Sequence, residues 1–477
     1  MQKVNTQTPL SDVYEDVNSS MDESTPKFLR LLKEHIKLEE LIPSDFYEAF
    51  NKEIGRPREY RLESLLWFHQ LKNIIGIPRD KAFLTVLAFS SELREFCGFK
   101  KLPAASEITR FRQNFSNYIG MMFECLVELT EPICRALDPK KSDYLIYDPT
   151  GIKAYVAENN PKFLNGKLTQ AKALAKKNPG YDPYKGVYSL LPETAKANSN
   201  VKHQYINGHF CYAHKAGILT NGIGIVRGIY PFDEQFRAKH PEIVTQKTDN
   251  PDLDKEIADS VSLKPVLSDF FNAHPTFSFK TFIADSSFDS YDSYKVLRND
   301  FHFERICIPL NPRNSSTAHT EFDSNGTPLC PLDKTPFTFI SASRGKNRSE
   351  RFKWVCHKSF KLNGSSSIRV RICNSPCTTS TYGRCVYTYL SKNLRLYPGI
   401  PRGTDHWHNL YRHRTLIERT INILKDDFGV AQRRAYSQLT ATADIFLAGI
   451  TQLLGVFLAF AINQSKFVKS VRKLISA

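Results

Sequence analysis

The stretch HNLYRHRTLIERTINILKDDFG, residues 408–429, decides how this chain is interpreted. It contains Tyr411, Arg414, Glu418 and Lys425, at intervals of three, four and seven residues. An α-helix turns about 100° per residue, so these four positions fall within a stripe about 60° wide. One carboxylate, two cations and a phenol are unsuited to a core. They suit a surface that holds a metal ion together with a phosphate backbone.

The composition indicates a polyanionic partner. The chain has 477 residues, with 65 Lys and Arg against 49 Asp and Glu and a formal net charge of +16. Such an excess favours nucleic acid, although a basic surface also serves solubility alone. Ten cysteines in a chain of this length do not form a disulfide framework, and the N-terminus shows no secretory signal pattern. We therefore expect a reducing cytoplasm.

One apolar run, IFLAGITQLLGVFLAFAI at residues 445–462, is long enough to cross a bilayer. Thr451 and Gln452 lie near its middle, Asp444 precedes it, and no comparable run exists elsewhere. We therefore predict a buried core helix and no membrane partner.

The first part of the chain is predicted to be helical. Residues 1–24 form a polar, acidic tail, and residues 25–137 contain several short helical segments separated by Gly and Pro breaks. Short helices with basic loops suit a DNA-binding domain, and Arg110 and Arg112 are candidates for backbone contacts. A plain helical bundle has the same periodicity and remains an alternative.

From residue 138 to 310 strands and helices alternate, which indicates an α/β domain with a site at a sheet edge. The segment YLIYD predicts a strand that ends at Asp148, and TFIAD predicts one that ends at Asp285. Two further strands flank Asn221-Gly222, a hairpin signal. Residues from about 157 to 203 are polar and are predicted to be an insertion.

Residues 311–405 are predicted to be a second insertion, mainly β and rich in cysteine, and residues 406–477 complete the α/β domain with C-terminal helices. A structural Zn²⁺ site can be formed by four thiolates, which would come here from Cys330, Cys356, Cys373 and Cys377. Buried free cysteines are the alternative. Trp354 either stacks on an unpaired base or fills the insertion's own small core.

Three acidic residues are candidates for a metal-binding site. Asp148 and Asp285 end strands, and Glu418 lies on the helix of the opening stretch. Clustered carboxylates repel one another unless cations neutralise them. Mg²⁺ accepts carboxylates together with phosphate oxygens, and two such ions can activate a hydroxyl and stabilise a leaving oxygen. Phosphodiester chemistry follows from this combination, although a single Asp at a strand end is often only a cap.

The spacing Y-x2-R-x3-E-x6-K resembles the signature of DDE transposases of bacterial insertion sequences. DPTGIKAYVAENNPKF from Asp148 resembles the first-acid motif of that group, and ADSSFDSYDSY around Asp285 resembles the second. GRPREYRLESLLWFHQL resembles the helical domain that precedes their catalytic domain. One departure is Ser287, where the group commonly has glycine, and it leaves Asp289 as a rival to Asp285.

The resemblance implies an α/β fold: an RNase H-like core with a mainly β insertion, preceded by an all-α domain. Asp148, Asp285 and Glu418 would be the catalytic acids and would bind Mg²⁺ or Mn²⁺. Arg414 and Lys425 would grip phosphates, and Tyr411 would lie near the terminal nucleotides.

The implied partners are double-stranded transposon ends and target DNA, bound by a dimer in the bacterial cytoplasm. Nearby cations were expected to add backbone binding: Lys392, Arg395, Arg402, Arg412, Arg419, Arg433 and Arg434. A nuclease without strand transfer and an inactive DNA-binding derivative remain alternatives.

Overall fold

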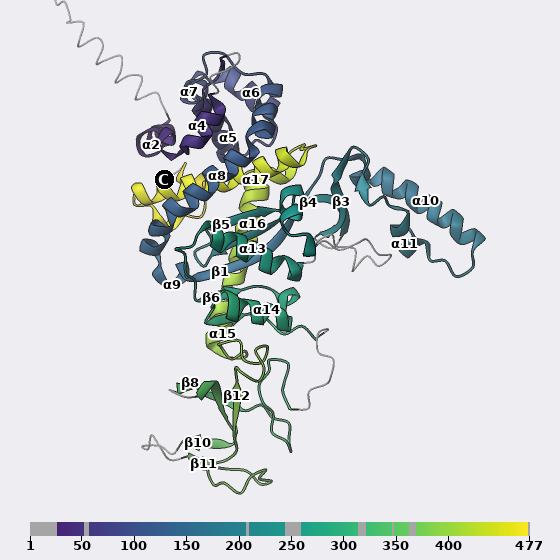
Figure 1. Ribbon diagram of the computed structural model, residues 1–477, viewed down its shortest axis with the longest axis vertical. Coiled ribbons are helices and arrows are strands. Elements are labelled where there is room, and N and C mark those ends of the chain that lie inside the picture. The colour runs from purple at the N-terminus through teal and green to yellow at the C-terminus, as the bar shows by residue number, and fades with distance from the viewer. Residues whose placement is uncertain are drawn as a thin grey trace, which may run out of the picture.

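A computed structural model describes residues 26–51, 57–206, 209–243, 259–312, 321–345, 348–361 and 369–475. The predicted tail at residues 1–24 lies outside these ranges. The described chain forms a helical N-terminal region, a central mixed sheet with helices, and a separate β-rich extension (Figure 1). The fold is therefore mixed α/β.

The N-terminal region is helical, as predicted. Its last helix, α8, has a non-helical residue at Phe115, where two helical segments meet at a kink. Helix α5 ends at Gly76, whose φ of 81° is left-handed and allows its N–H to bond back to Lys72 and Asn73. The helices are α2 (Lys27–His35), α3 (Leu38–Leu41), α4 (Ser44–Phe50), α5 (Leu62–Ile75), α6 (Asp80–Phe89), α7 (Ser91–Phe96) and α8 (Ala105–Leu137).

The central sheet combines antiparallel and parallel strands. Its order is β2-β3-β4-β1-β6-β7, and β5 also pairs with β4. Strand β1 pairs antiparallel with β4 and parallel with β6, and β6 pairs parallel with β7. The strands are β1 (Tyr144–Lys153), β2 (Thr194–Ala195), β3 (Asn198–Ile206), β4 (His209–Asn221), β5 (Val226–Pro231), β6 (Thr281–Ile283) and β7 (Arg305–Cys307).

Strand β1 differs from the prediction, because it does not end at Asp148. Its parallel pairing with β6 stops at Ile146, but its antiparallel pairing with β4 continues to Lys153. Beyond it, residues 157–203 hold α10 (Pro161–Lys177), α11 (Pro183–Gly186), β2 and the first part of β3. The polar composition that predicted an insertion therefore conceals a 17-residue helix and two strands of the main sheet.

Short helices connect and cover the sheet: α9 (Pro139–Ser142), α12 (Glu234–Lys239), α13 (Asp259–Ala273) and α14 (Tyr291–Lys295). Helix α13 packs on the face of the sheet to which Tyr147 points, where the Tyr147 hydroxyl lies 2.7 Å from Ser262 Oγ. Successive strand residues point to opposite faces, so Asp148 faces away from α13.

The β-rich extension projects from the rest of the protein as a separate lobe (Figure 1). It holds the sheet β12-β9-β8 and the pair β10-β11, with β8 (Thr338–Gly345), β9 (Arg348–Val355), β10 (Ser359–Lys361), β11 (Arg369–Arg371) and β12 (Cys385–Tyr389). Trp354 is 3% exposed in the lobe's own core, and its Nε1 donates to Thr388 at 3.0 Å. Of the two predicted roles for Trp354, the structural role is the one the geometry supports.

After the lobe the chain returns through α15 (Asp405–Tyr411) and α16 (Thr415–Asn422) to α17 (Gln438–Ala461). Helix α17 is apolar and long enough to cross a membrane by length and composition. It is instead mostly buried against α8, α5 and β5. A Cβ at Gly449 would come within 2.7 Å of both Phe123 and Ile229, so only glycine permits this close approach.

A buried charged cluster joins α17 to the N-terminal helices. We call Lys72, Asp80, Arg112, Arg433 and Asp444 the helix-interface cluster. Asp444 accepts from Arg112 at 2.7 Å and from Arg433 at 2.6 Å, and Asp80 accepts from Lys72 at 2.5 Å and also pairs with Arg112. The prediction of Arg112 as a DNA contact is wrong, because this side chain is buried in ion pairs. Arg110 is exposed.

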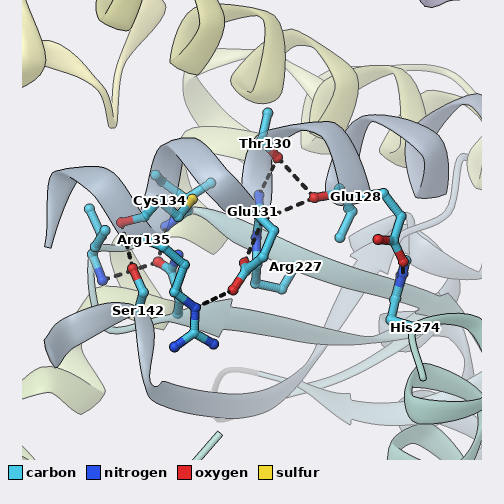
Figure 2. A network of polar contacts seen from close by, with 12 residues as sticks. Glu128, Thr130, Glu131, Cys134, Arg135, Ser142, Arg227 and His274 are labelled. Carbon is cyan, nitrogen blue, oxygen red and sulfur yellow. Dashed lines mark hydrogen bonds and ion pairs between the residues drawn. The ribbon is translucent and has the colours of Figure 1, made fainter. Parts of the chain in front are cut away.

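Another buried arginine, Arg227, ties α8 to the sheet (Figure 2). Arg227 on β5 is fully buried and donates to Thr130 at 2.7 Å and to Glu131 at 3.3 Å. Farther along α8, Glu128 lies 2.5 Å from Nδ1 of His274, at the end of α13. These contacts fix α8 and α13 against the sheet that carries the candidate site.

Candidate active site

Asp148 and Asp285 are neighbours because of strand register. Ile146 on β1 pairs with Ile283 on β6 in the parallel ladder, and each aspartate lies two residues farther along its strand direction. The two carboxylates therefore share one end of the sheet. Asp285 also caps a 3₁₀ turn, where it accepts the N–H of Ser287 at 2.8 Å. The Ser287 hydroxyl, which the glycine of the family motif would lack, also donates to the same oxygen at 2.5 Å and helps to fix the orientation of this carboxylate.

Glu418 joins them from α16, which packs against β1 and β4. The buried face of α16 contains Ile417, Thr420 and Ile421, so Glu418 remains on the exposed side. Its partner is Arg414, one helical turn earlier.

The guanidinium of Arg414 connects all three acids. It pairs with Glu418, and its Nη2 lies 3.4 Å from Asp148 Oδ2 and 3.6 Å from Asp285 Oδ2. We call Asp148, Asp285, Arg414 and Glu418 the sheet-edge cluster. One cation therefore stands among three carboxylates contributed by two strands and a helix.

The pKa values of Asp148 and Arg414 reflect both burial and this imbalance of charge. Burial raises the pKa of Asp148 to about 7; Arg414 lowers it, and Asp285, Asp259 and Glu418 raise it. Burial alone would lower the pKa of Arg414, but its hydrogen bond to Glu418 and the charges of the acids leave that pKa raised. At neutral pH Asp148 is therefore partly protonated, first because it is buried and then because the neighbouring acids repel its charge.

The other two residues of the predicted stripe also face this end of the sheet. Tyr411 stacks on Trp407, with centroids 4.8 Å apart, and burial raises its pKa. Lys425 Nζ donates to the Gly151 carbonyl at 2.8 Å and lies 3.3 Å from Thr150 Oγ1. Burial lowers the pKa of Lys425.

The segment that carries this stripe is not one uniform α-helix. A 3₁₀ turn at Arg412–Arg414 joins α15 to α16, and a π-helical turn at Ile423–Asp427 follows. A 3₁₀ turn is wound more tightly than an α-helix and a π-turn more loosely, so their effects on side-chain direction oppose each other.

Asp259 was missed by the sequence reasoning. It begins α13, pairs with Lys215 at 2.5 Å, and acts on the pKa of Asp148. No strand precedes it closely in the described chain, so the strand-end pattern that marked the other aspartates gave no signal here.

Asp289, the rival to Asp285, has a structural environment. It is fully buried, and Arg395 binds it through two nitrogens, the closest contact being 2.6 Å. The Tyr294 hydroxyl and the Asn311 N–H also donate to it. Its oxygens are committed to the protein, which favours Asp285 as the site residue.

The predicted basic surface is smaller than expected. Arg395 is held by Asp289, Arg402 donates to the carbonyls of Ile308 and Arg395, and Arg433 belongs to the helix-interface cluster. These three were wrongly expected on the DNA surface. The exposed members are Lys392, Arg412, Arg419 and Arg434.

Neither predicted metal site is preassembled. Within the described ranges, no group of three or more His, Cys, Asp or Glu side chains is arranged to hold a metal ion. Of the four candidate zinc ligands, Cys330 and Cys356 are buried in the lobe core, with Cys377 packed against them. Cys373 instead donates to the Ser375 carbonyl at 3.3 Å. In the sheet-edge cluster, the acids gather around Arg414.

Sequence comparison adds a family for the N-terminal region. Residues 17–114 match a family model described as "Transposase domain (DUF772)". This match supports a transposase. The matched region ends at Asn114, directly before the kink at Phe115 in α8. No curated protein matches the chain.

Among solved structures, the cryo-EM structure of a piggyBac transposase synaptic complex with hairpin DNA is similar to this chain. The identity is 10% and the TM-score 0.40, over 95% of this chain and 81% of that chain. This similarity is too weak to carry an argument about the site.

Proposed function

We propose that this protein is a DDE-type DNA transposase that cuts the ends of its element and joins them to target DNA. The observation that carries the proposal is the sheet-edge cluster. Three carboxylates far apart in the sequence meet around one guanidinium, at 3.4 and 3.6 Å for the two aspartates. The transposase match over residues 17–114 supports the same reading.

The chemistry of the cluster fits a hard divalent ion. Carboxylate oxygens are the ligands that Mg²⁺ and Mn²⁺ prefer, and Asp148, Asp285 and Glu418 would hold the ion. Burial is the largest cause of the raised pKa of Asp148, and the charges of Asp285, Asp259 and Glu418 add to it, so a bound divalent ion would favour the ionised carboxylate. When bound, divalent ions supply activation of a water or 3′-hydroxyl and stabilisation of the leaving oxygen.

Arg414 would then bind first the three acids and afterwards the DNA backbone. Without DNA its guanidinium pairs with all three acids. A planar fork of donors also fits a phosphate, so an incoming DNA backbone competes with the acids for Arg414. Transfer of Arg414 from carboxylates to phosphate would free the acids when the substrate arrives. Lys425 adds a point charge beside β1, and Tyr411 forms one wall of the site.

The test uses purified protein, plasmid DNA carrying the sequences that flank the gene, and Mg²⁺ or Mn²⁺. Asp148→Ala is expected to lower end cleavage by at least about 10³-fold, because it removes an acid that positions the metal. The control is Asp292→Ala, which changes an exposed acid seven residues beyond Asp285. Equal cleavage by Asp148→Ala and wild type would overturn the proposal.

The same assay separates the alternatives. Joined DNA products identify a transposase, and cleavage without joined products identifies a nuclease. A wild-type protein that binds DNA but never cleaves with either metal is the inactive derivative. Because two ends must be held for joining, we also propose a dimer on DNA, measurable as two protein chains per paired-end complex.

A further inference from the structure

Helices α10 and α11 form an arm that projects from the body beyond β3 (Figure 1). Between Pro161 and Gly186 its only acid is Asp182, whereas its lysines are Lys162, Lys167, Lys172, Lys176, Lys177 and Lys185. Six lysines against one aspartate give the arm a net charge of +5. All six except the half-buried Lys167 are exposed, and none forms an ion pair with another described residue.

A basic helix is often only a solvated face, so its position in the molecule decides how it is interpreted. Strand β1 runs from Asp148 toward the arm, and positively charged side chains lie along this path. Lys425 contacts the Gly151 carbonyl, Lys153 is exposed at the strand end, and the Arg434 guanidinium lies 4.8 Å from the ring centre of Tyr155. Positive charge therefore continues from the sheet-edge cluster to the first turn of α10.

The length of this track matches a DNA duplex. A strand rises about 3.3 Å per residue, so Lys153 lies roughly 17 Å along β1 from Asp148. A 17-residue helix adds about 26 Å. Laid end to end, these two segments measure about 43 Å, slightly more than one turn of B-DNA, which is ~34 Å.

We propose that the arm binds the phosphate backbone of duplex DNA about one helical turn from the sheet-edge cluster. The location of that DNA relative to the acids rests on the proposed function, but the arm's affinity for duplex does not. An anionic membrane is the other polyanion to consider. It fits less well, because Leu164 and Leu174 are the only large apolar side chains exposed on α10, and two leucines offer little apolar area to a bilayer interface.

The test compares two triple variants with equal loss of charge. Lys172→Gln, Lys176→Gln and Lys177→Gln neutralise the arm, and glutamine preserves helix propensity. The control is Lys239→Gln, Lys264→Gln and Lys295→Gln, exposed lysines on α12, α13 and α14. The probe is a fluorescent mixed-sequence duplex of about 60 base pairs, titrated with protein between about 50 and 200 mM salt.

Each lost phosphate contact reduces the slope of log K against log[salt] by about 0.9, so the arm variant should lose about 2.7 units of slope. Over that salt range its affinity should fall roughly 40-fold less than wild-type affinity does. The control should keep the wild-type slope.

Equal slopes for the two triple variants would overturn the inference. So would an arm variant that binds the duplex normally but loses binding to vesicles containing phosphatidylserine. The outcome is separable from failure of the proposed function. A wild-type protein that never cleaves DNA, combined with a reduced slope only in the arm variant, would leave the arm's role intact and remove the catalytic one.

Discussion

The protein contains two charged clusters of similar size and opposite balance. The helix-interface cluster has three cations for two acids, and these charges lower the pKa of Asp444 to about 2 despite its burial. The sheet-edge cluster has one cation for three acids, and the pKa of Asp148 is raised to about 7. We call the first cluster complete, because each of its acids is paired with two cations of the chain. The second gains from a further cation, which is what a site for a metal and a polyanion requires.

The largest effect on stability is expected at the complete cluster. Asp444→Asn would leave Arg112 and Arg433 buried without their shared carboxylate, and breaking a buried ion pair costs about 3–5 kcal/mol. The free energy of unfolding, measured with denaturant at pH 7, should fall by that amount. Asp292→Asn, at an exposed acid, is the control and should leave the free energy of unfolding nearly unchanged.

Asp444→Asn should also change how the free energy of unfolding depends on pH in the acid range. Because the pKa of Asp444 is lowered below that of an unfolded chain, its stabilising contribution is present above about pH 4 and is lost as pH falls toward 2. The loss of stability between those values should be shallower in Asp444→Asn than in wild type. Parallel curves would show that Asp444 is not the group responsible.

The incomplete cluster should behave in the opposite way. The folded-state pKa of Asp148, about 7, lies above its unfolded value, so the folded state binds more protons between about pH 4 and 7. Wild-type stability in EDTA should therefore fall as pH rises through this range. Asp148→Asn should remove that fall and be more stable than wild type at pH 8 by about 1 kcal/mol or more. A less stable Asp148→Asn at pH 8 would contradict the comparison.

The contrast between the two clusters also explains which features of the protein could be predicted from its sequence. Helical spacing follows local rules, so the sequence correctly put Glu418 on a helix. Asp285 lies just beyond β6, near the predicted strand end, but Asp148 lies inside β1, because the pairing of β1 with β4 continues to Lys153. The burial of Arg112, Arg395, Arg402 and Arg433 depends on partners up to 360 residues away, as for Arg433 and Asn73. A single sequence does not distinguish an arginine that pairs inside the protein from one that faces solvent. Asp259 was missed for another reason: no strand precedes it closely in the described chain, so no strand-end pattern marked it.

Arg414 provides a sharper test of the incomplete cluster. If its guanidinium acts as a substitute cation, Arg414→Met should let the three acids bind Mn²⁺ more tightly without DNA, by about tenfold, because a competing charge is gone. Isothermal calorimetry measures this affinity, and end cleavage should fall in the same variant. Arg412→Met, an exposed arginine on the same turn, is the control and should leave Mn²⁺ affinity unchanged. Weaker Mn²⁺ binding in Arg414→Met would show that Arg414 organises the acids rather than occupying their centre.

The smallest effect is expected at Tyr411, whose place in the stripe came from resemblance more than from chemistry. Its ring stacks on Trp407, and its hydroxyl forms no hydrogen bond to any described residue. Tyr411→Phe keeps the stack and should change end cleavage by less than about threefold, whereas Tyr411→Ala removes the wall beside the acids and should lower it by about tenfold. A large loss in Tyr411→Phe would instead assign the hydroxyl a contact made only with DNA bound. Tyr411 would then belong with Arg414 among the groups that the sheet-edge cluster leaves available for a substrate.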